Sequence, residues 1–334
     1  MIPGAPHQAR WMRAEPRRSL PAPVLERIAR TAFPGCRVLS SEPLGDGKRN
    51  ANFKLHLDPA PAPVVLRIYE HDPTLCQKEI DLMRLVSAAV PVPEVIYAEP
   101  HGWEDLPPFT FTRWIEGITF KELKRSGDAD AIPQAAQAAG EILATIGSFR
   151  FPKPGWLAPG PTVGAPLVEG ADPTPRFIDL CLAAENLQRR MAAELCDRTH
   201  ALVWSWAPRL AALDAETSLV HGDFNKRNLL LRPAGGRWRV AAVLDWEFAV
   251  SSSPLADLGS FLRYERAARP LAEPHFSVGY MHAGGRLPHD WRRLAQLLNL
   301  VALCESLTHD ELQDDVVAEL VELVRATIED RDPE

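Results

Sequence analysis

The segment 219–231 constrains this chain more than any other, because it encloses a polar loop between two apolar runs. It reads LVHGDFNKRNLLL, so one acid, two cations and two amides lie between two predicted buried strands. A further apolar run, VAAVL at 240–244, leads directly into Asp245. An acid and an amide in one loop, with an acid after the next strand, can hold Mg²⁺ beneath a nucleotide. Mg²⁺ prefers oxygen ligands and takes one or two carboxylates when phosphates complete its shell.

The polar loop and the acid after it resemble those of a known family. HGDFNKRN followed by LDWE is similar to the catalytic and metal-binding loops of the aminoglycoside phosphotransferase and choline kinase-like family, whose fold resembles that of protein kinases. The spacing from His221 through Asp223 to Asn228 is that of the kinase pattern H-R-D-x-x-x-x-N. The resemblance implies that Asp223 is the catalytic base and that ATP or GTP is the phosphoryl donor. It also implies that Asn228 and Asp245 bind Mg²⁺.

Two cations, Lys226 and Arg227, lie inside the same loop. A cation here can offset the charge that develops on the γ-phosphate, and we assign this role to Arg227, one place before Asn228. The alternative for each of the two is a solvated surface cation. We interpret His221 as a brace that hydrogen-bonds backbone near the metal loop, and the resemblance implies that Asp257 braces the catalytic loop.

The loop after the second apolar run differs from that of regulated protein kinases. Glu247 stands where D-F-G has its glycine, and Asp257 follows Asp245 by only twelve positions. This spacing leaves no room for a phosphorylatable activation loop with an A-P-E end. The pattern therefore favours a small-molecule kinase over a regulated protein kinase.

A glycine-bearing turn lies near the start of the chain. Strands are predicted at 38–39 and 53–57, and the segment between them carries Gly45, Gly47 and Asn50. Glycines let backbone amides approach phosphate oxygens closely, although a plain hairpin turn explains the same pattern equally well. Beside the later motifs, the turn resembles the nucleotide-covering loop of the family, in which an Asn commonly lies where Asn50 does.

A cation interrupts the next predicted strand, 64–69, at Arg67. Burying this charge is costly unless it is paired. In the following helix Glu79 shares the core-facing side with apolar residues, so an ion pair between Arg67 and Glu79 is predicted. Such a pair would resemble the Lys–Glu pair of kinases and would direct Arg67 toward the nucleotide. The alternative is an edge-strand Arg whose side chain extends to solvent.

The segment 109–114 alternates like a strand and is, by its order along the chain, the last strand of the small lobe. The resemblance implies that it runs into the hinge between the lobes. Backbone groups of Arg113, Trp114 and Ile115 would then contact the purine of the nucleotide.

The chain beyond the hinge is predicted to be mostly helical. Apolar spacing predicts a helix over 131–149, one long helix over 177–195, another over 202–213, and further helices to the C-terminus. A Pro- and Gly-rich segment, 152–175, is either an insertion that, as the resemblance implies, shapes the acceptor pocket, or a solvated surface excursion. Acids within 305–315 are either helix-terminal residues or a negative wall for an amine-bearing acceptor.

Composition restricts the class of protein. The chain has 334 residues, of which 46% are hydrophobic and 24% charged, as in soluble globular proteins with two domains or lobes. Its net charge of −7 argues against nucleic acid as the main partner and is compatible with a cationic acceptor. Five dispersed cysteines without a CxxC pair suggest reduced thiols. No apolar run has the length of a signal peptide core or a membrane helix, so a cytoplasmic protein without a membrane partner is expected.

Together these patterns predict an α+β protein with a protein-kinase-like, two-lobed fold. Residues 1–20 are expected to form a flexible arm, 21–116 a nucleotide-binding lobe with a small antiparallel sheet plus a helix, and 117–334 a larger, mostly helical catalytic and acceptor-binding lobe. The expected activity is transfer of the γ-phosphoryl group of ATP or GTP to a hydroxyl of an aminoglycoside-like antibiotic, amino alcohol or sugar. The alternative is a catalytically silent nucleotide-binding or scaffold protein. The chain lacks the G-x-G-x-x-G of Rossmann dehydrogenases and the G-x-S-x-G of serine hydrolases, which argues against both classes of enzyme.

Overall fold

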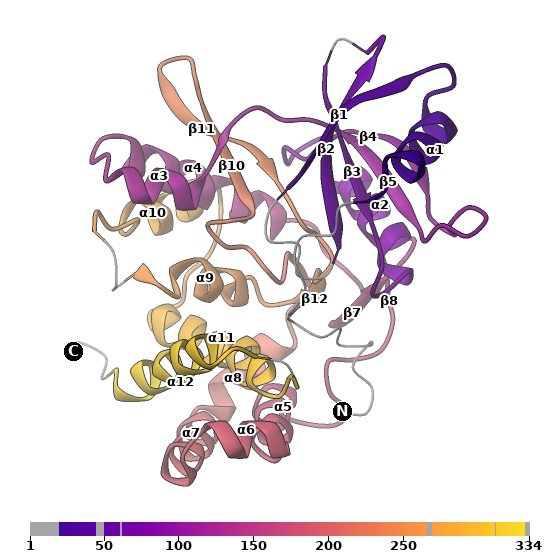
Figure 1. Ribbon diagram of the computed structural model, residues 1–334. Coiled ribbons are helices and arrows are strands. Elements are labelled where there is room, and N and C mark those ends of the chain that lie inside the picture. Colours follow the sequence, from indigo (N-terminus) through magenta and orange to yellow (C-terminus); the bar gives the residue numbers. More distant parts are fainter. Residues whose placement is uncertain (1–19, 45–49, 61, 266–268, 311, 331–334) are drawn as a thin grey trace.

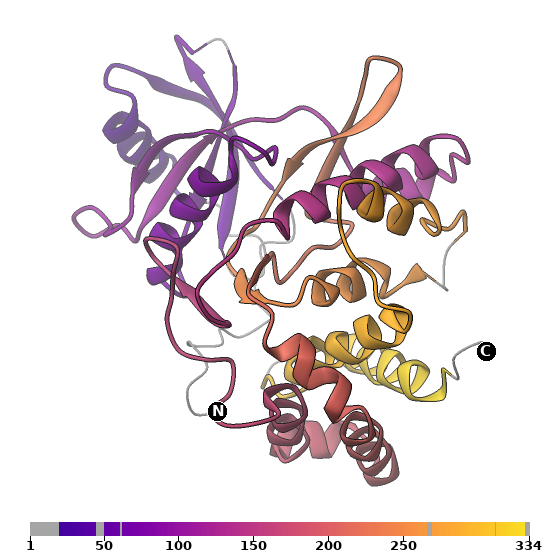
Figure 2. The same ribbon diagram turned by 180° about the vertical axis from the view of Figure 1, so that it is seen from behind.

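The computed structural model places the chain in a small and a large lobe (Figures 1 and 2). The residues that it describes are 20–44, 50–60, 62–265, 269–310 and 312–330. The predicted arm, apart from Leu20, and the turn glycines Gly45 and Gly47 therefore lie outside the described residues.

The small lobe is built on a five-stranded antiparallel sheet with the order β1-β2-β3-β5-β4. Side chains alternate between the two faces of a strand, and in β3 the buried residues Val64, Leu66 and Ile68 share one face. The helix α1 packs Leu25 and Ile28 into the same apolar cluster. The elements of this layer are α1 (Ala22–Ala32), β1 (Arg37–Pro43), β2 (Ala51–Asp58), β3 (Val64–Ile68), β4 (Val95–Glu99) and β5 (Phe109–Arg113).

The opposite face of the sheet carries Arg67 and is joined to the helix α2 (Thr74–Val86). This helix links two apolar clusters. Its Ile80 packs in a small cluster beside the sheet, whereas Leu82 belongs to the core of the large lobe. Glu79 lies between these contacts and is buried, so it needs a cationic or hydrogen-bonding partner.

The large lobe is mostly helical (Figure 1), and its described residues enclose one large apolar core. Two residues of the predicted site loops are fully buried in this core: Phe224 from the polar loop and Trp246 from the loop after β11. Each side chain attaches its loop to the core. Within the described part of the chain, no helix combines the length and apolarity needed to cross a membrane. The helices are α3 (Phe120–Ser126), α4 (Ala131–Ile146), α5 (Pro173–Leu182), α6 (Glu185–Arg190), α7 (Ala193–Ser205), α8 (Ala207–Asp214), α9 (Leu255–Leu262), α10 (His275–His282), α11 (Trp291–Leu307) and α12 (Asp314–Glu329).

Two small sheets position the loops that carry the predicted site. One has the strand order β8-β7-β12-β9 and the other β11-β10-β6. The polar loop runs from β9 of the first sheet to β10 of the second, and Asp245 comes shortly after β11, the antiparallel partner of β10. The strands are β6 (Ile118–Thr119), β7 (Gly155–Ala158), β8 (Thr162–Val163), β9 (Ser218–Val220), β10 (Leu229–Ala234), β11 (Arg237–Val243) and β12 (Val250–Ser252).

The main predicted elements are present. The small antiparallel sheet with its helix precedes a larger helical lobe, and the predicted strands 64–69 and 109–114 correspond to β3 and β5. The segment 152–175 is partly ordered, because it contains β7, β8 and the start of α5. The predicted helix over 202–213 is instead the end of α7 followed by α8.

The prediction of one long helix over 177–195 is wrong, because the chain there forms α5, α6 and the start of α7. The breaks turn α6 toward the end of α11. Arg190 donates to the carbonyl of Leu307 at 2.7 Å, and Asn186 donates to the carbonyl of Thr308 at 3.0 Å. These bonds satisfy carbonyls that the last turn of a helix leaves without an intrahelical donor.

Candidate active site

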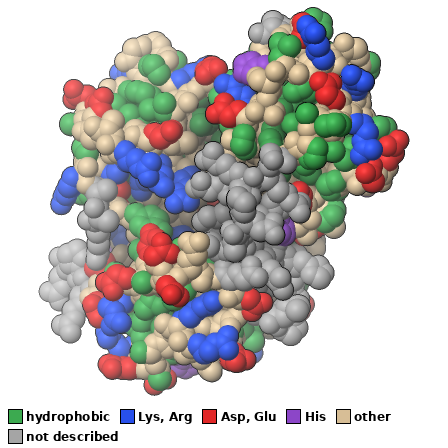
Figure 3. All heavy atoms as spheres, in the orientation of Figure 1, with side chains coloured by type: hydrophobic (Ala, Val, Ile, Leu, Met, Phe, Trp, Pro, Cys, Tyr) green, Lys and Arg blue, Asp and Glu red, His purple; other side chains and the backbone are tan. Residues whose placement is uncertain are grey.

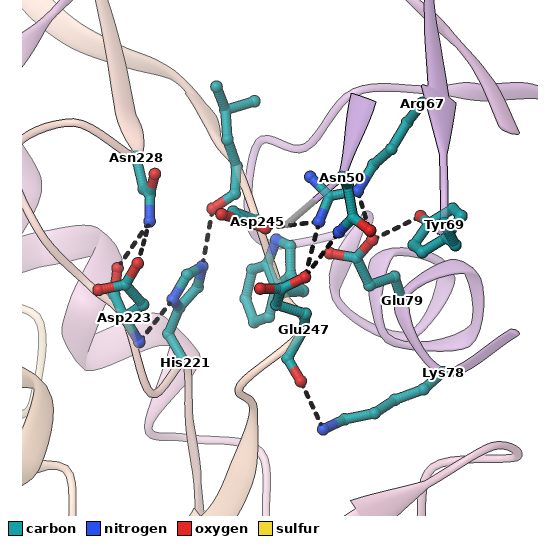
Figure 4. A network of polar contacts seen from close by, with 12 residues as sticks. Asn50, Arg67, Tyr69, Lys78, Glu79, His221, Asp223, Asn228, Asp245 and Glu247 are labelled. Carbon is teal, nitrogen blue, oxygen red and sulfur yellow. Dashed lines mark hydrogen bonds and ion pairs between the residues drawn. The ribbon is translucent and has the colours of Figure 1, made fainter. Parts of the chain in front are cut away.

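Asp223 lies in the loop between β9 and β10, held by two side-chain amides. Its carboxylate accepts hydrogen bonds from Nδ2 of Asn225 at 2.6 Å and Nδ2 of Asn228 at 2.8 Å. The Asn228 amide also donates to the Asp223 backbone carbonyl at 3.0 Å. Because both bonds use the amide nitrogen, the side-chain oxygen of Asn228 points away from Asp223 (Figure 4). In this orientation the amide nitrogen of Asn228 fixes the Asp223 carboxylate, and its amide oxygen is left for a metal ion.

The surroundings of Asp223 make it more basic than an ordinary carboxylate. Burial, reinforced by the neighbouring charge of Asp245, raises the pKa of Asp223 to about 6. The hydrogen bonds from Asn225 and Asn228 act in the opposite direction. A carboxylate with a raised pKa accepts a proton more readily, which suits a general base working near neutral pH.

His221 is a neutral brace. Its Nδ1 accepts the backbone N–H of Asp223 at 3.2 Å, so its Nε2 carries the proton and donates to the carbonyl of Leu244 at 3.0 Å. Burial lowers the pKa of His221 to about 4, which keeps the ring uncharged at neutral pH. The predicted brace toward the backbone of the metal loop is therefore confirmed.

Asp257 in α9 fixes the loop that carries Asp223, as the resemblance implied for the catalytic loop. Its buried carboxylate accepts the backbone N–H of His221 at 2.7 Å and that of Gly222 at 3.0 Å. Gly222 has φ +81°, and a Cβ added there would lie 2.3 Å from the carbonyl oxygen of Phe248. A residue without a side chain is needed at this contact. The catalytic loop therefore lies directly against the loop that follows β11.

Arg67 joins three carboxylates from the two lobes (Figure 4). Its Nε lies 3.1 Å from Glu79 of α2, and its Nη2 lies 2.7 Å from Asp245 and 3.1 Å from Glu247. The predicted ion pair of Arg67 with Glu79 is present. The edge-strand alternative is wrong, because the Arg67 side chain is only 17% exposed. This cluster ties the sheet of the small lobe to the predicted metal loop.

Glu247, for which the sequence suggested no role, belongs to the same cluster. Its carboxylate accepts Nδ2 of Asn50 at 2.8 Å, and its backbone carbonyl accepts Nζ of Lys78 at 2.8 Å. Asn50, at the end of the predicted nucleotide-covering turn, is therefore bonded to the loop after β11 (Figure 4). The sequence shows an acid at this position of the LDWE run, but it does not show the partners of Glu247, which are far away along the chain.

The predicted hinge is partly engaged in internal bonds. The backbone N–H of Arg113 donates to the carbonyl of Glu94 at 2.9 Å, and the two side chains form an ion pair of 2.7 Å. A purine contact at Arg113 would have to use its carbonyl. The ring of Trp114 lies under Nζ of Lys54, 4.0 Å from the ring centroid. The purine contacts of Arg113, Trp114 and Ile115 stay a prediction.

The two cations of the catalytic loop have different surroundings. Nζ of Lys226 donates to the carbonyl of Phe261 at 2.5 Å and lies 3.6 Å from Glu265, and burial lowers the pKa of Lys226 to about 8. Lys226 therefore attaches the loop to Phe261 in α9 and to Glu265, which follows α9. Arg227 is exposed, and its backbone N–H donates to the side-chain oxygen of Asn225 at 2.8 Å. Of the two, Arg227 has the side chain that a phosphate can reach.

Asn228 and Asp245 offer the oxygen ligands that were predicted for Mg²⁺. Two protein ligands suit this ion when nucleotide phosphates and waters complete its shell. Among the described residues, no group of three or more His, Cys, Asp or Glu gathers to hold a metal. The residues present therefore fit an Mg²⁺ ion that arrives with a nucleotide.

Comparison with known proteins places the chain among phosphotransferases. The model of the phosphotransferase enzyme family (APH) matches residues 40–297. The chain is 28% identical over 250 residues to acyl-CoA dehydrogenase family member 11 of Gallus gallus, which covers 70% of this chain and 30% of that protein. It is 26% identical over 184 residues to acyl-CoA dehydrogenase family member 10 of Mus musculus, covering 54% of this chain and 16% of that protein. The chain thus spans less than a third of these relatives.

Solved structures of similar fold include aminoglycoside phosphotransferases. A thermostable mutant of APH(4)-Ia, in ternary complex with AMP-PNP and hygromycin B, aligns with a TM-score of 0.67 at 19% identity, covering 91% of this chain and 97% of that chain. The GDP and kanamycin complex of APH(2")-IIIa aligns with a TM-score of 0.66 at 19% identity, covering 91% and 98%. At this level of identity the likeness concerns the fold. It confirms the predicted protein-kinase-like, two-lobed α+β architecture.

Proposed function

Because the chain belongs to the phosphotransferase enzyme family, we propose that it moves the γ-phosphoryl group of ATP or GTP to a hydroxyl group of a small molecule. One observation carries this proposal: the Asp223 carboxylate is oriented by Asn228, and His221 bonds both the Asp223 backbone and the carbonyl of Leu244, directly before Asp245. Phosphoryl transfer needs a base for the acceptor and a metal site for the donor at one place. Solved structures of the same fold are complexes with AMP-PNP, ADP or GDP, which supports a nucleoside triphosphate as donor.

Asp223 is the proposed base of the reaction. It accepts the proton of the acceptor hydroxyl as the hydroxyl oxygen bonds to the γ-phosphorus, and the bond to the β–γ bridging oxygen breaks. The electron pair of that bond leaves with the nucleoside diphosphate. Placement of such a base contributes about 10²–10⁴-fold to a rate. Mg²⁺, held by Asn228 and Asp245, would neutralise negative charge on the β- and γ-phosphate oxygens.

Arg67 is the proposed phosphate contact from the small lobe. It is permanently charged and lies beside Asp245, with Glu79 and Glu247 holding its guanidinium. Glu247 also accepts the amide of Asn50, so Asn50 and Arg67 share one carboxylate. We assign this carboxylate to positioning both groups for the nucleotide.

Calorimetric titration of ATP and of GTP into the purified protein, with and without Mg²⁺, tests the donor site. We expect one of the two nucleotides to bind, with an affinity that Mg²⁺ increases. Absence of binding for both nucleotides would contradict the proposal and leave a kinase-shaped scaffold.

Release of ADP or GDP in the presence of candidate acceptors tests the transfer itself. The panel includes kanamycin and hygromycin B, which occur in the solved structures of similar fold. It also includes hydroxylated acyl-CoA esters, because the relatives are named as acyl-CoA dehydrogenase family members. Acceptor-dependent release that Asp223→Asn abolishes supports the proposal. Nucleotide binding without release for every acceptor would favour the catalytically silent alternative.

A further inference from the structure

Arg263, at the C-terminal end of α9, is fixed against α11. The two helices are in backbone contact at Gly259, where an added Cβ would lie 2.2 Å from the carbonyl oxygen of Ala295. One helical turn further on, Nε and Nη2 of Arg263 donate to Oδ1 of Asn299 at 3.0 and 2.7 Å. Asn299 is buried, with 6% of its surface exposed. The close helix contact therefore holds the Arg263 guanidinium in one place.

The Arg263 guanidinium also lies near the candidate base. The helix α9 is attached to the catalytic loop at both ends, through Asp257 at its start and through the Phe261 carbonyl that accepts Lys226. Whereas burial raises the pKa of Asp223, the positive charge of Arg263 acts in the opposite direction, so the two groups are within electrostatic reach. Arg263 therefore belongs to the surroundings in which an acceptor hydroxyl would lie.

The charge of Arg263 is not neutralised by a carboxylate among the described residues. Within the part of the chain that the structure describes, its side-chain hydrogen bonds go to the neutral amide of Asn299, and Nη1 makes none. The residue is partly exposed, so a bound molecule can reach the Nη1 donors. A carboxylate or phosphate group of a bound molecule would satisfy them, because arginine pairs with both groups through two parallel hydrogen bonds.

A second cation and an aromatic ring lie beside Arg263. Burial raises the pKa of Tyr264, and the charges of Arg263 and Arg227 act in the opposite direction, so both cations lie within electrostatic reach of its hydroxyl. Tyr264 is 43% exposed, and the negative charge of Glu319 in α12 adds to the rise of its pKa. Within the described residues Glu319 forms no ion pair with either arginine. Arg263 therefore adds a positive charge near Asp223, and the exposed Arg227 lies on the same loop as Asp223.

We propose that Arg263 binds an anionic group of the acceptor, so that the hydroxyl compound is a carboxylate- or phosphate-bearing acid and not a polyamine. This inference rests on the proposed function, because it concerns the acceptor of the same reaction. An anion paired with Arg263 would hold its hydroxyl near Asp223, whereas an ammonium group would meet like charges. The overall charge of −7 allowed a cationic acceptor, but recognition depends on the charges at the site and not on the average over the surface.

The late acids considered as a negative wall have other contacts. Asp310 accepts Nδ2 of Asn186 at 2.8 Å, at the junction of α6 and the end of α11. Asp314 and Asp315 lie in the first turn of α12, where negative charge is favourable. Glu311 lies outside the described residues. These contacts correspond to the helix-terminal interpretation of the acids.

Matched acceptors test the charge preference. Glycerate, glyceramide and 3-amino-1,2-propanediol share a diol and differ in an anionic, neutral or cationic end. With saturating nucleotide and Mg²⁺, we expect nucleoside diphosphate release with glycerate to exceed that with the cationic diol by at least about tenfold, the effect of one charged hydrogen bond. A preference for the cationic diol or for kanamycin would overturn this inference and leave the proposed phosphoryl transfer intact.

Arg263→Gln tests the residue, because glutamine keeps an amide donor for Asn299 and loses the charge. We expect KM for the anionic acceptor to rise by about 10- to 100-fold more than KM for the neutral acceptor, because only the anionic acceptor loses an ion pair. Arg189→Gln is the matched control, since Arg189 is exposed on α6 and pairs with Glu185 of the same helix. An equal loss for all acceptors would mean that Arg263 only tunes Asp223, which contradicts the inference.

Anion binding tests the same residue without turnover. Sulfate is added at constant ionic strength to the complex with ADP and Mg²⁺, and the thermal midpoint is followed for the wild type, Arg263→Gln and Arg189→Gln. We expect the wild type and the control to gain stability that Arg263→Gln does not gain. Identical shifts in all three proteins would overturn the inference, whichever acceptors are found.

Discussion

Arg67 and Asp245 form an ion pair of 2.7 Å that links the sheet of the small lobe to the loop after β11. Asp245 has a left-handed backbone with φ +69°, which is uncommon for a residue other than glycine. Such strain persists where the surroundings hold it, and here Arg67 and the contact between Gly222 and Phe248 do so. The proposed metal ligand is therefore held by both lobes.

Asp245→Ala is predicted to remove the Mg²⁺ dependence of nucleotide binding. The substitution deletes the proposed carboxylate ligand and one of the three acids that orient Arg67. We expect the affinity measured by calorimetry in Mg²⁺ to fall by at least about tenfold, or roughly 1.4 kcal/mol. Asp105→Ala is a suitable control, because Asp105 is exposed and pairs with Arg27 of α1. Unchanged affinity in the Asp245 variant would place the metal elsewhere.

Asp223→Asn is predicted to abolish turnover while leaving nucleotide binding largely intact. The amide is similar in size but cannot accept a proton, so we expect nucleoside diphosphate release to fall by about 10²–10⁴-fold. The new amide keeps one acceptor oxygen for Asn225 or Asn228, so the loop is expected to stay folded. The variant is assayed by product release and by ATP titration in parallel. Full activity would remove Asp223 from the role of base.

The parts of the site that share a short stretch of sequence were predictable. Asp223 and Asn228 lie in the loop between β9 and β10, and Asp245 follows β11, the antiparallel partner of β10, so a short stretch of sequence sets their spacing. Arg67 and Glu79 were predictable as a pair because a buried cation in a strand requires an acid, and the next helix offered one on its inward face. In each case the residues that interact are close together in the sequence.

The parts that depend on distant contacts were not predictable. Glu247 acts through Asn50 and Arg67, which are 197 and 180 positions away, and Arg263 acts through Asn299 on another helix. No local pattern reveals such partners. The breaks that separate α5, α6 and α7 were missed for the same reason. The apolar periodicity continues across them, whereas contacts of α6 with the end of α11, far along the chain, stabilise the turns.

Gly222→Ala is predicted to lower stability and activity together. A methyl group there adds a left-handed strain of about 1–2 kcal/mol and a clash with the Phe248 carbonyl, so we expect the free energy of unfolding to fall by more than about 2 kcal/mol. Gly235→Ala is the matched control, since Gly235 also has a positive φ (+60°) but an added Cβ would meet nothing within 4 Å.

Urea denaturation and product release are measured for both glycine variants. The control is expected to show the backbone strain alone and to retain full turnover. Equal losses of stability at the two positions would mean that the contact of Gly222 with Phe248 yields to a methyl group, and that the register of the two loops is not fixed by this contact.

The stability of the protein is predicted to depend on pH through Asp257. Burial raises the pKa of Asp257 from the ordinary 3.8 to about 7, although the backbone N–H groups of His221 and Gly222 act in the opposite direction. The folded state therefore binds this proton more tightly than the unfolded chain does. The contribution of Asp257 to the free energy of unfolding is then full below about pH 4 and is lost progressively as the pH rises to about 7.

Asp257→Asn isolates this contribution, because the amide does not titrate. We expect the wild type to exceed the variant in free energy of unfolding by more at about pH 5 than at about pH 7.5, as measured by urea denaturation at each pH. A difference that grows with pH would mean that Asp257 is ionised in the folded protein. The bonds from His221 and Gly222 would then outweigh burial, and the catalytic loop would be anchored by a charged group.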